Sequence, residues 1–324
     1  MEPISSPGKE EIYMWLNERL NIQYPLIQGG MAHIATGAFA ASVSNAGALG
    51  LIAGGGMSPK QLREEIRIAK SKTDKPFGVN LMLMHPELET LAKIVIEEGV
   101  QVVTTGAGNP GKYIPEWKAA GILVMPVVPS VALAKRCVRN GADAIIVEGT
   151  EAGGHVGELT TMALVPQVVA EVDVPVIAAG GIASGAQLLA AIALGAQGVQ
   201  VGTILLASDE CPIHQNYKDA ILKAKDTDTT VTGRIAGTPV RILKNKMSKE
   251  YIRKEKEGAS MMELEKYTLG SLGKAVRDGD VDHGSLMSGQ VAGMVHVQRP
   301  VATIIATLFE DYEKAKERVN EVHL

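Results

Sequence analysis

His155 is the titratable residue whose setting in the sequence most favours chemistry. It lies in the segment EAGGHVGEL, where Gly153, Gly154 and Gly157 flank it and give the loop freedom to bring the imidazole beside a ligand. An imidazole titrates near neutral pH, so it can donate or accept a proton during a reaction. A lone histidine in a surface loop is the ordinary alternative. The flanking glycines favour a catalytic histidine, and we predict that role for His155.

Two glycine-containing turns predict a binding site for an anion. The segments AAGGIASG and QVGT contain Gly180, Gly181, Gly202 and Thr203. Glycine lets backbone amides approach a phosphate closely, and the start of a following helix adds partial positive charge. A single Gly-Gly pair is more often only a tight turn. Because the two turns follow neighbouring predicted strands, we predict that these four residues hold a phosphate, although spacing alone does not identify the ligand.

Asn80 and Glu148 come at the ends of two other apolar segments, FGVNLM and AIIVEG. Both side chains can hydrogen-bond to hydroxyl groups or to the polar edge of a ring. A glutamate at the end of an apolar strand is costly unless it has such a partner. A structural ion pair is the alternative explanation for Glu148. We predict that both residues bind the ligand.

Several other chemistries find no support in the sequence. Cys137 and Cys211 are far apart, lack CxxC spacing and do not follow predicted strands, so we expect neither a disulfide nor a cysteine nucleophile. This cysteine usage suits a reducing cytoplasm, the expected location. No HExxH motif or paired cysteine indicates a catalytic metal. No lysine follows a strand, which argues against pyridoxal phosphate.

The elements that must position these residues form a regular series. Short apolar segments alternate with amphipathic or buried helical segments, and this rhythm is typical of βα units in a parallel sheet. Eight such units predict a (β/α)8 barrel, whose active site lies at the carboxyl ends of the strands. The expected strands span residues 25–30, 49–55, 77–82, 101–108, 123–129, 144–149, 175–181 and 198–203.

An open, doubly wound sheet is the alternative architecture, because βα units alone do not show closure. The count of eight, and the lack of a GxGxxG motif near the first strand, favour the barrel. We expect residues 12–206 to form the barrel strands and 207–292 an inserted, mostly helical cap without strands. Residues 293–324 are expected to form a C-terminal helix that returns to the barrel as its eighth helix.

Bulk properties exclude some partners. A formal net charge of −4 over 324 residues, with no arginine-rich stretch, gives no indication of nucleic acid binding. The first twenty residues contain acidic side chains and no continuous apolar core, unlike a signal peptide. Residues 174–208 carry no charge, but glycines interrupt them, so we expect buried strand and helix and no membrane span.

The motifs resemble those of a known family. PLIQGGMA, DKPFGVNLML, VVTTGAGNP, EGTEAGGHVGELTTM, PVIAAGGIASG and VQVGT, followed by TVTGRIAGTPVR and GSLMSGQ, are similar to the flavin-dependent enoyl-acyl-carrier-protein reductase (FabK type) of bacterial fatty acid synthesis. The resemblance extends from about residue 21 to residue 293. Nitronate monooxygenases of the same superfamily share the barrel, the GGM start, the AGGH loop and the phosphate site. TTGAGNP, PVVPSVALAKR, the cap and GSLMSGQ favour the reductase.

The resemblance implies roles for individual residues. The flavin mononucleotide (FMN) would contact Met31, Ala32, Asn80, Glu148, Gly154, Gly180, Gly181, Gly202 and Thr203, and His155 would be the catalytic histidine. The segment MAHIATG differs from the MAWVA usual in the family, so the role of His33 near the flavin stays open. The first ten or so residues have no counterpart in the family.

The resemblance also implies a reaction and partners. NADH or NADPH would reduce the flavin, and the reduced flavin would reduce a trans-2-enoyl thioester carried by acyl carrier protein or coenzyme A. A homodimer and activation by a monovalent cation are implied in the same way. The rival function is oxidation of nitroalkanes or nitronates with oxygen, and a flavin-binding protein without turnover is a third possibility.

A basic segment in the expected cap suggests where an acidic carrier protein could dock. Seven basic residues fall within residues 241–256: Arg241, Lys244, Lys246, Lys249, Arg253, Lys254 and Lys256. Glu250 and Glu255 are interleaved with them, so a solvated helix is an equal alternative.

Overall fold

The computed structural model describes residues 14–322. Residue 12, where the barrel was expected to begin, lies outside the described residues, as do most of the N-terminal segment compared with a signal peptide and His323. None of the helices in the described part of the chain is both long and apolar enough to span a membrane.

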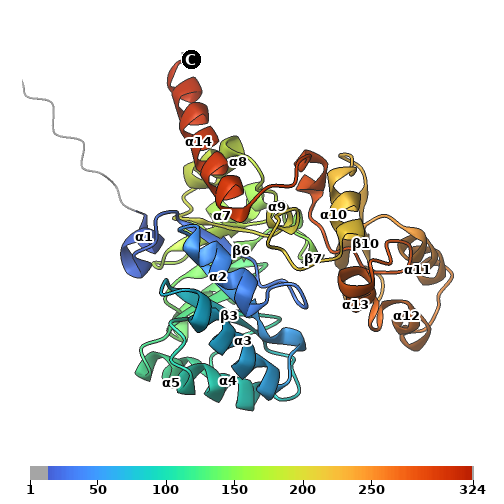
Figure 1. Ribbon diagram of the computed structural model, residues 1–324, viewed down its shortest axis with the longest axis horizontal. Helices are drawn as coiled ribbons and strands as arrows, with labels where there is room; N and C mark the ends of the chain where they lie inside the picture. Colours follow the sequence, from blue (N-terminus) through green and yellow to red (C-terminus); the bar gives the residue numbers. More distant parts are fainter. Residues whose placement is uncertain (1–13, 323–324) are drawn as a thin grey trace, which may run out of the picture.

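Eight parallel strands close into a barrel, and all eight expected strands are confirmed (Figure 1). The strand order β1-β9-β8-β6-β5-β4-β3-β2 returns to its start through a parallel bridge between Ile27 and Leu49. This closure rules out the open, doubly wound sheet. The strands are β1 (Leu26–Gln28), β2 (Gly50–Ala53), β3 (Phe77–Met82), β4 (Val102–Gly106), β5 (Leu123–Val128), β6 (Ile145–Glu148), β8 (Val176–Ala179) and β9 (Val199–Val201).

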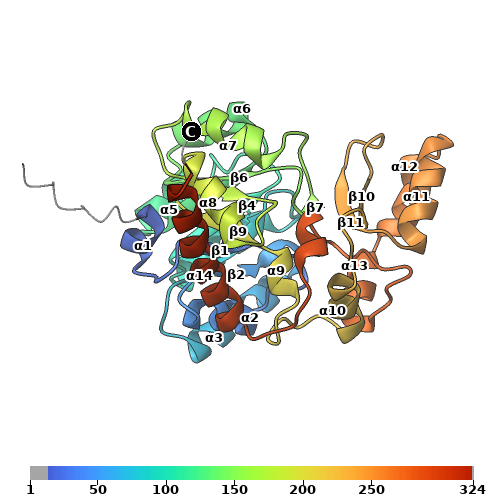
Figure 2. The same ribbon diagram turned by 90° about the horizontal axis from the view of Figure 1, so that it is seen from above.

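Helices between the strands cover the outside of the barrel. Their starts are fixed by side chains that accept orphan backbone N–H groups, as in the capping box of Ser58 and Gln61 and the cap at Ser184. These helices are α2 (Gly37–Asn45), α3 (Pro59–Lys72), α4 (Leu88–Glu97), α5 (Ile114–Ala119), α6 (Val131–Arg139), α7 (Thr161–Val169) and α8 (Gly185–Ala193). The long helix α14 (Val301–Asn320) packs between α8 and α2 (Figure 2).

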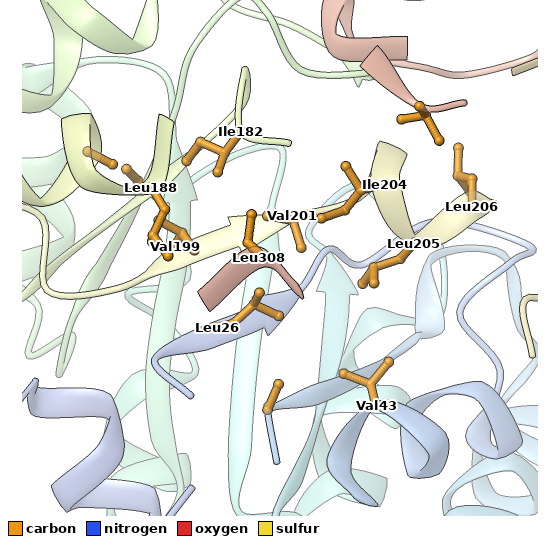
Figure 3. Close-up of a cluster of buried hydrophobic side chains, with 14 of the residues drawn as sticks. Leu26, Val43, Ile182, Leu188, Val199, Val201, Ile204, Leu205, Leu206 and Leu308 are labelled. Carbon is orange, nitrogen blue, oxygen red and sulfur yellow. The ribbon is translucent and has the colours of Figure 1, made fainter. Parts of the chain in front are cut away.

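Apolar side chains pack against both the inner and the outer surface of the barrel wall. Inside it, Ile27, Leu51, Ile146 and Ile177 form one cluster with Leu16 of α1 (Trp15–Leu20), which closes the amino-terminal end of the barrel. Outside it, the strands pack against the helices. Figure 3 shows this outer layer where Leu26, Val199 and Val201 face Leu188 and Leu308. The burial of these clusters holds the carboxyl ends of the strands in fixed positions.

Between β9 and α14 the chain forms the cap, which is mostly helical as expected. The expectation that it lacks strands is wrong, because β10 (Thr229–Thr232) and β11 (Val240–Leu243) form an antiparallel hairpin. Each strand has only four residues, too few for alternation to stand out, although TTVT and VRIL are rich in β-branched side chains. The short helix α9 (Thr203–Leu206) leads from β9 into the cap. The other cap elements are α10 (Gln215–Leu222), α11 (Lys246–Lys256), α12 (Met261–Thr268), α13 (Ser271–Gly273), the π-helix η2 (Lys274–Asp278) and the 3-10 helix η3 (Gln290–Met294).

Candidate active site

Four polar side chains point into the barrel at one level. Successive side chains on a strand point to opposite faces of the sheet. On each of the four strands, an apolar neighbour of the polar residue packs against the outer helices, so Asn80, Thr104, Glu148 and Gln200 point inward. Asn80 is paired in register with Thr104, and Ala179 of β8 is paired with both Glu148 and Gln200. The four residues therefore form a polar layer above the apolar interior of the barrel.

This polar layer has hydrogen-bonding capacity that the protein does not use. The Oγ1 atom of Thr104 and the Oε1 atom of Gln200 are buried, and neither has a hydrogen-bond partner among residues 14–322. Buried polar atoms are nearly always paired in folded proteins, so unpaired ones facing one space indicate a polar ligand. Burial raises the pKa of Glu148 to about 7, which lets this carboxyl group either donate or accept a hydrogen bond near neutral pH.

The predicted phosphate turn has the backbone that it requires. Gly180 and Gly181 have φ angles of +89° and +75°, which side chains other than glycine rarely adopt. A Cβ atom on Gly180 would also lie only 3.0 Å from the carbonyl oxygen of Gly149. The turn precedes the N-terminus of α8, and its carbonyl at Gly180 accepts a hydrogen bond of 2.9 Å from the Thr161 hydroxyl. Its amide groups are therefore held at a fixed place near a helix start.

A cavity of about 340 Å³ opens beside this turn. Gly181, Glu151, Gln187 and Gln290 are among the residues that line it. The carboxylate of Glu151 accepts a 2.9 Å hydrogen bond from the backbone of Thr161, so its charge is directed toward the start of α7. The cavity gives the predicted phosphate turn access from outside the barrel.

The turn at Gly202 and Thr203 lies next to the turn at Gly180 and Gly181 and next to β1. Ala179 of β8 pairs with Gln200, and Gly202 and Thr203 follow directly after β9. The hydroxyl oxygen of Thr203 accepts a hydrogen bond of 2.9 Å from the backbone N–H of Gly289. The GSLMSGQ segment therefore returns from the cap to the predicted phosphate site.

Met31 and Ala32 lie in the loop after β1, between the second turn and Asn80. A Cβ atom on Gly202 would contact the Met31 sulfur at 3.5 Å, and one on Gly30 would overlap the side chain of Asn80 at 2.4 Å. The close approach of the chain to Asn80 therefore requires glycine at position 30. The structure thus brings the predicted residues of β1, β3, β6, β8 and β9 to one end of the barrel.

His155 lies on a short strand that belongs to the cap's sheet. The strand β7 (Gly154–His155) pairs with β11, and His155 is aligned with Val240. The His155 side chain reaches solvent, but partial burial lowers the pKa of its imidazole below the ordinary value of 6.5. A Cβ atom on Gly154 would contact the sulfur of Met287 at 3.5 Å. The histidine is therefore placed between the barrel mouth and the cap.

The position of Arg241 contradicts the expectation that this residue belongs to a basic docking surface. Its side chain is only 6% exposed and it is aligned with Gly154 in the β7–β11 pair. Its Nε donates a 3.0 Å hydrogen bond to the carbonyl of Thr150, and its Nη1 donates a 3.1 Å hydrogen bond to the hydroxyl of Thr229. Arg241 therefore ties the loop that carries His155 to the cap hairpin, and it is not available to a partner protein.

Three of the six remaining basic residues of this segment form ion pairs within the cap. Lys246 bonds to Asp282 at 2.7 Å, and Arg253 forms ion pairs with Glu250 and Glu257, both at 2.5 Å. Lys254 lies 3.6 Å from Glu257 as well. Such pairs are typical of a solvated helix. Lys244, Lys249 and Lys256 are the basic residues of the segment for which no carboxylate partner occurs among the described residues.

The two cysteines are buried away from this site. Burial raises the pKa of Cys137 to about 11 and that of Cys211 to about 12. A thiol with such a pKa is almost wholly protonated at neutral pH and is a poor nucleophile. Both positions agree with the prediction that cysteine chemistry plays no part.

Gln200 and Arg241 were not predicted to belong to the site, and Thr104 was not among the predicted site residues. Gln200 was detectable, since it is the one polar residue in the strand Val199–Val201 and alternation directs it inward. Arg241 was not, because its contacts are with residues 91 and 12 positions away in the chain. Together, the polar layer and the two turns fit a ligand that combines a phosphate with a polar-edged ring, as a flavin does.

Comparison with known proteins identifies relatives over most of the described residues. The profile of the family described as "Nitronate monooxygenase" matches residues 14–311. A probable nitronate monooxygenase of Staphylococcus saprophyticus is 38% identical over 285 residues, covering 74% of this chain and 79% of that protein.

A second kind of relative is named for a thioester substrate. The (3aS,4S,5R,7aS)-5-hydroxy-7a-methyl-1-oxo-octahydro-1H-indene-4-carboxyl-CoA dehydrogenase of Rhodococcus jostii is 38% identical over 228 residues. The match covers 70% of this chain and spans 65% of the length of the dehydrogenase.

Among solved structures, FabK from Thermotoga maritima is similar over both the barrel and the cap. It is 46% identical, with a TM-score of 0.93 over 95% of this chain and 99% of that chain. A nitroalkane oxidase from Streptomyces ansochromogenes is 27% identical, with a TM-score of 0.82 over 92% of this chain and 98% of that chain.

Proposed function

This chain belongs to the nitronate monooxygenase family of oxidoreductases, and within it we propose that the protein is an FMN-dependent enoyl-acyl-carrier-protein reductase driven by NADH or NADPH. The observation that carries the proposal is the 46% identity to FabK over 95% of this chain, because the nitroalkane oxidase, which covers 92% of this chain, is only 27% identical. The motifs of the barrel alone are shared with nitronate monooxygenases and do not separate the two functions. The relative named as a carboxyl-CoA dehydrogenase supports an acyl thioester as substrate.

The polar layer and the glycine turns are proposed to hold the FMN. Gly180, Gly181, Gly202 and Thr203 would bind its phosphate through backbone amides and the helix start. Around the flavin ring we place Met31, Ala32, Asn80, Glu148 and Gly154, and we add Gln200 and Thr104, whose buried oxygens lack partners in the described chain. When bound, the FMN would accept hydride from the nicotinamide and deliver it to the β-carbon of the enoyl thioester.

His155 is proposed to deliver the proton that completes the reduction. Addition of hydride at the β-carbon leaves negative charge on the thioester enolate, and a nearby acid must protonate its α-carbon. The lowered pKa of His155 makes its imidazolium a stronger acid than a free histidine. His155 would donate this proton directly or through a water that it holds. The proton-transfer step is therefore expected to slow as the pH rises above that lowered pKa.

The proposal is tested by following the flavin without oxygen. The purified protein is mixed anaerobically with NADH or NADPH, and crotonyl thioester is added afterwards. Loss of the oxidised flavin absorbance on the first addition and its recovery on the second support the reductase. A flavin that no nicotinamide reduces would contradict it and would indicate a flavin-binding protein without turnover.

A nitronate monooxygenase is the second candidate, because the family profile and the Staphylococcus relative both have that name. Such an enzyme would consume oxygen with a nitroalkane or nitronate and need no nicotinamide. Oxygen uptake with nitroethane, in the absence of nicotinamide, measures this activity directly. A cytoplasmic location, a homodimer and activation by a monovalent cation belong to the reductase proposal.

A further inference from the structure

Residues 287–290, the return segment, lead the chain from the cap back to the proposed phosphate site. The backbone N–H of Gly289 donates a 2.9 Å hydrogen bond to the hydroxyl oxygen of Thr203. The next N–H, from Gln290, donates a 2.9 Å hydrogen bond to the carbonyl of Glu151. Two consecutive amides therefore fix the return segment against two parts of the barrel mouth, one after β6 and one after β9.

The packing around Gly289 is too tight for the return segment to move toward the barrel. A Cβ atom on Gly289 would lie only 2.6 Å from the carbonyl oxygen of Glu151. A Cβ atom on Gly153 would lie 2.7 Å from the carbonyl carbon of Ser288. Because the barrel side allows no shift, the position of the return segment depends on what holds it from the cap side.

Tyr217 of α10 is the side chain that holds the return segment from the cap. It is fully buried, and its hydroxyl donates a 2.8 Å hydrogen bond to the carbonyl of Met287, two residues before Gly289. An isolated antiparallel bridge to Ile242 of β11 holds Met287 as well. Burial raises the pKa of Tyr217, so its hydroxyl keeps its proton and remains a donor. Ser288 and Gly289 lie outside the helices and strands, so individual contacts such as these set their position.

The hydrogen bond from Gly289 determines what the Thr203 hydroxyl can do. Thr203 is buried, and its oxygen already accepts the N–H of Gly289. This bond occupies one lone pair and restricts rotation of the hydroxyl, whose proton has no acceptor among residues 14–322. Buried donors are nearly always paired, so the free proton indicates an acceptor on a ligand, such as a phosphate oxygen.

We propose that Tyr217 is a positioning residue for the FMN phosphate. By fixing the return segment, Tyr217 keeps the N–H of Gly289 on the Thr203 hydroxyl and so directs the hydroxyl proton to a phosphate oxygen. It acts through Thr203 and not through a contact of its own with the flavin. The inference rests on the flavin site of the proposed function, but it does not depend on the reaction that the flavin performs.

The test compares the binding of FMN with that of riboflavin, which lacks the phosphate. Both are titrated by fluorescence into the full-length protein from which the flavin has been removed. The variants are Tyr217→Phe, which removes only a hydroxyl, Thr203→Val, which removes the proposed donor with little change of shape, and the double variant. The matched control is Tyr251→Phe, at another buried tyrosine of the cap. Tyr251 belongs to α11, which lies farther from the barrel than α10 does (Figures 1 and 2).

We expect Thr203→Val to weaken FMN binding about tenfold or more, as the loss of a hydrogen bond to a charged group predicts. Tyr217→Phe should weaken it about fivefold, because the return segment keeps its other contacts. The double variant should bind FMN no more weakly than Thr203→Val does, since Tyr217 acts through Thr203. Riboflavin affinity should stay within about twofold in every variant, and Tyr251→Phe should change neither affinity by more than that.

The proposal is overturned if Tyr217→Phe binds FMN as tightly as Tyr251→Phe does. An equal loss of riboflavin and FMN affinity would overturn it too, because the substitution would then loosen the whole site. So would a further loss of FMN affinity in the double variant, which would show that Tyr217 acts independently of Thr203. A parent protein that binds FMN but reduces no enoyl thioester would contradict the proposed reductase alone, and the comparison of affinities would still decide. A parent that binds neither flavin would contradict both.

Discussion

The barrel mouth and the cap differ in how far their polar groups are paired within the protein. In the barrel, Glu148, Gln200 and Thr104 lie against apolar walls, and two of them leave buried oxygens without partners in the described chain. In the cap, the charges of α11 are mostly neutralised by neighbouring carboxylates. The difference shows where a ligand is expected, since unsatisfied polar groups cost stability until something binds them.

One link joins the two regions at the proposed catalytic residue. His155 follows the barrel strand β6 in the chain, but its backbone pairs with the cap hairpin. Arg241 adds a hydrogen bond from the cap to the carbonyl of Thr150. Binding is therefore expected to depend on the barrel, and catalysis on the connection between barrel and cap.

The sharpest test of this division is His155→Ala. We expect the rate of enoyl thioester reduction to fall by about 10²–10⁴-fold, as the loss of a general acid predicts. FMN content and melting temperature should stay at the parent values, because the side chain is exposed and the proposed phosphate and ring contacts of the flavin lie mostly in the barrel. Stopped-flow reoxidation by crotonyl-CoA and flavin absorbance measure the two quantities. His296→Ala, another exposed histidine, is the control.

Near-normal turnover of His155→Ala would remove this residue from the mechanism. Loss of FMN together with turnover would show instead that the loop serves binding, and the comparison between barrel and cap would then fail.

Glu148→Gln tests how much the buried carboxyl group of the polar layer destabilises the FMN-free protein. Burial raises the pKa of this acid from 4.5 to about 7, so the folded state disfavours its charged form, and stability is lost as the pH rises through that window. At pH 8 the variant should unfold with a free energy about 3 kcal/mol larger than the parent, and at pH 4 the two should be equal. Urea denaturation at both pH values gives the difference. The same gain at pH 4 would show that ionisation is not its cause.

Arg241→Met tests the link itself. It removes the hydrogen bond to Thr150 and leaves that carbonyl unpaired, so we expect about a tenfold fall in turnover and about 1 kcal/mol less stability. Thr229→Val is the matched control, since it removes only the other partner of the guanidinium. Turnover assays and urea denaturation compare the two variants. Equal turnover in both would mean that Arg241 does not position the His155 loop.

The smallest effect is expected at the cap surface. Lys249 has no carboxylate partner among the described residues, and its reversal in Lys249→Glu should raise the KM for a carrier-bound substrate about threefold at most. The KM for the coenzyme A thioester should not change. Arg139→Glu, on the barrel helix α6, controls for net charge. A tenfold or larger rise in KM would show that the cap docks the carrier through this face after all.

The barrel was predictable from the sequence because its strands are apolar and evenly spaced. Parallel strands buried on both faces need uninterrupted apolar residues, and the run Phe77–Met82 matches its expected limits. The hairpin of the cap was not predictable in the same way. Its four-residue strands pair through contacts that no local pattern records, and β7 adds only two residues.

The residues of the candidate site also differ in whether the sequence alone could predict them. Gly180 and Gly181 were recognisable because a turn with positive φ angles requires glycine, so the residue type itself carries the signal. Arg241 was misplaced because a charged residue among lysines resembles a surface residue until its distant partners are known. His33 was noted only as a departure from the family, and its positive φ angle of +61° is visible in three dimensions alone.

The hydrogen bond between Thr203 and Gly289 has a consequence for engineering. The two residues are 86 positions apart, and they lie where the chain leaves the barrel and where it returns. Both ends of the intervening segment are thus fixed at one point of the barrel, the geometry in which a domain insertion is best tolerated. The cap can be regarded as an exchangeable segment, so replacing it with the equivalent segment of a relative is expected to retain the proposed flavin site and to change the substrate that reaches it.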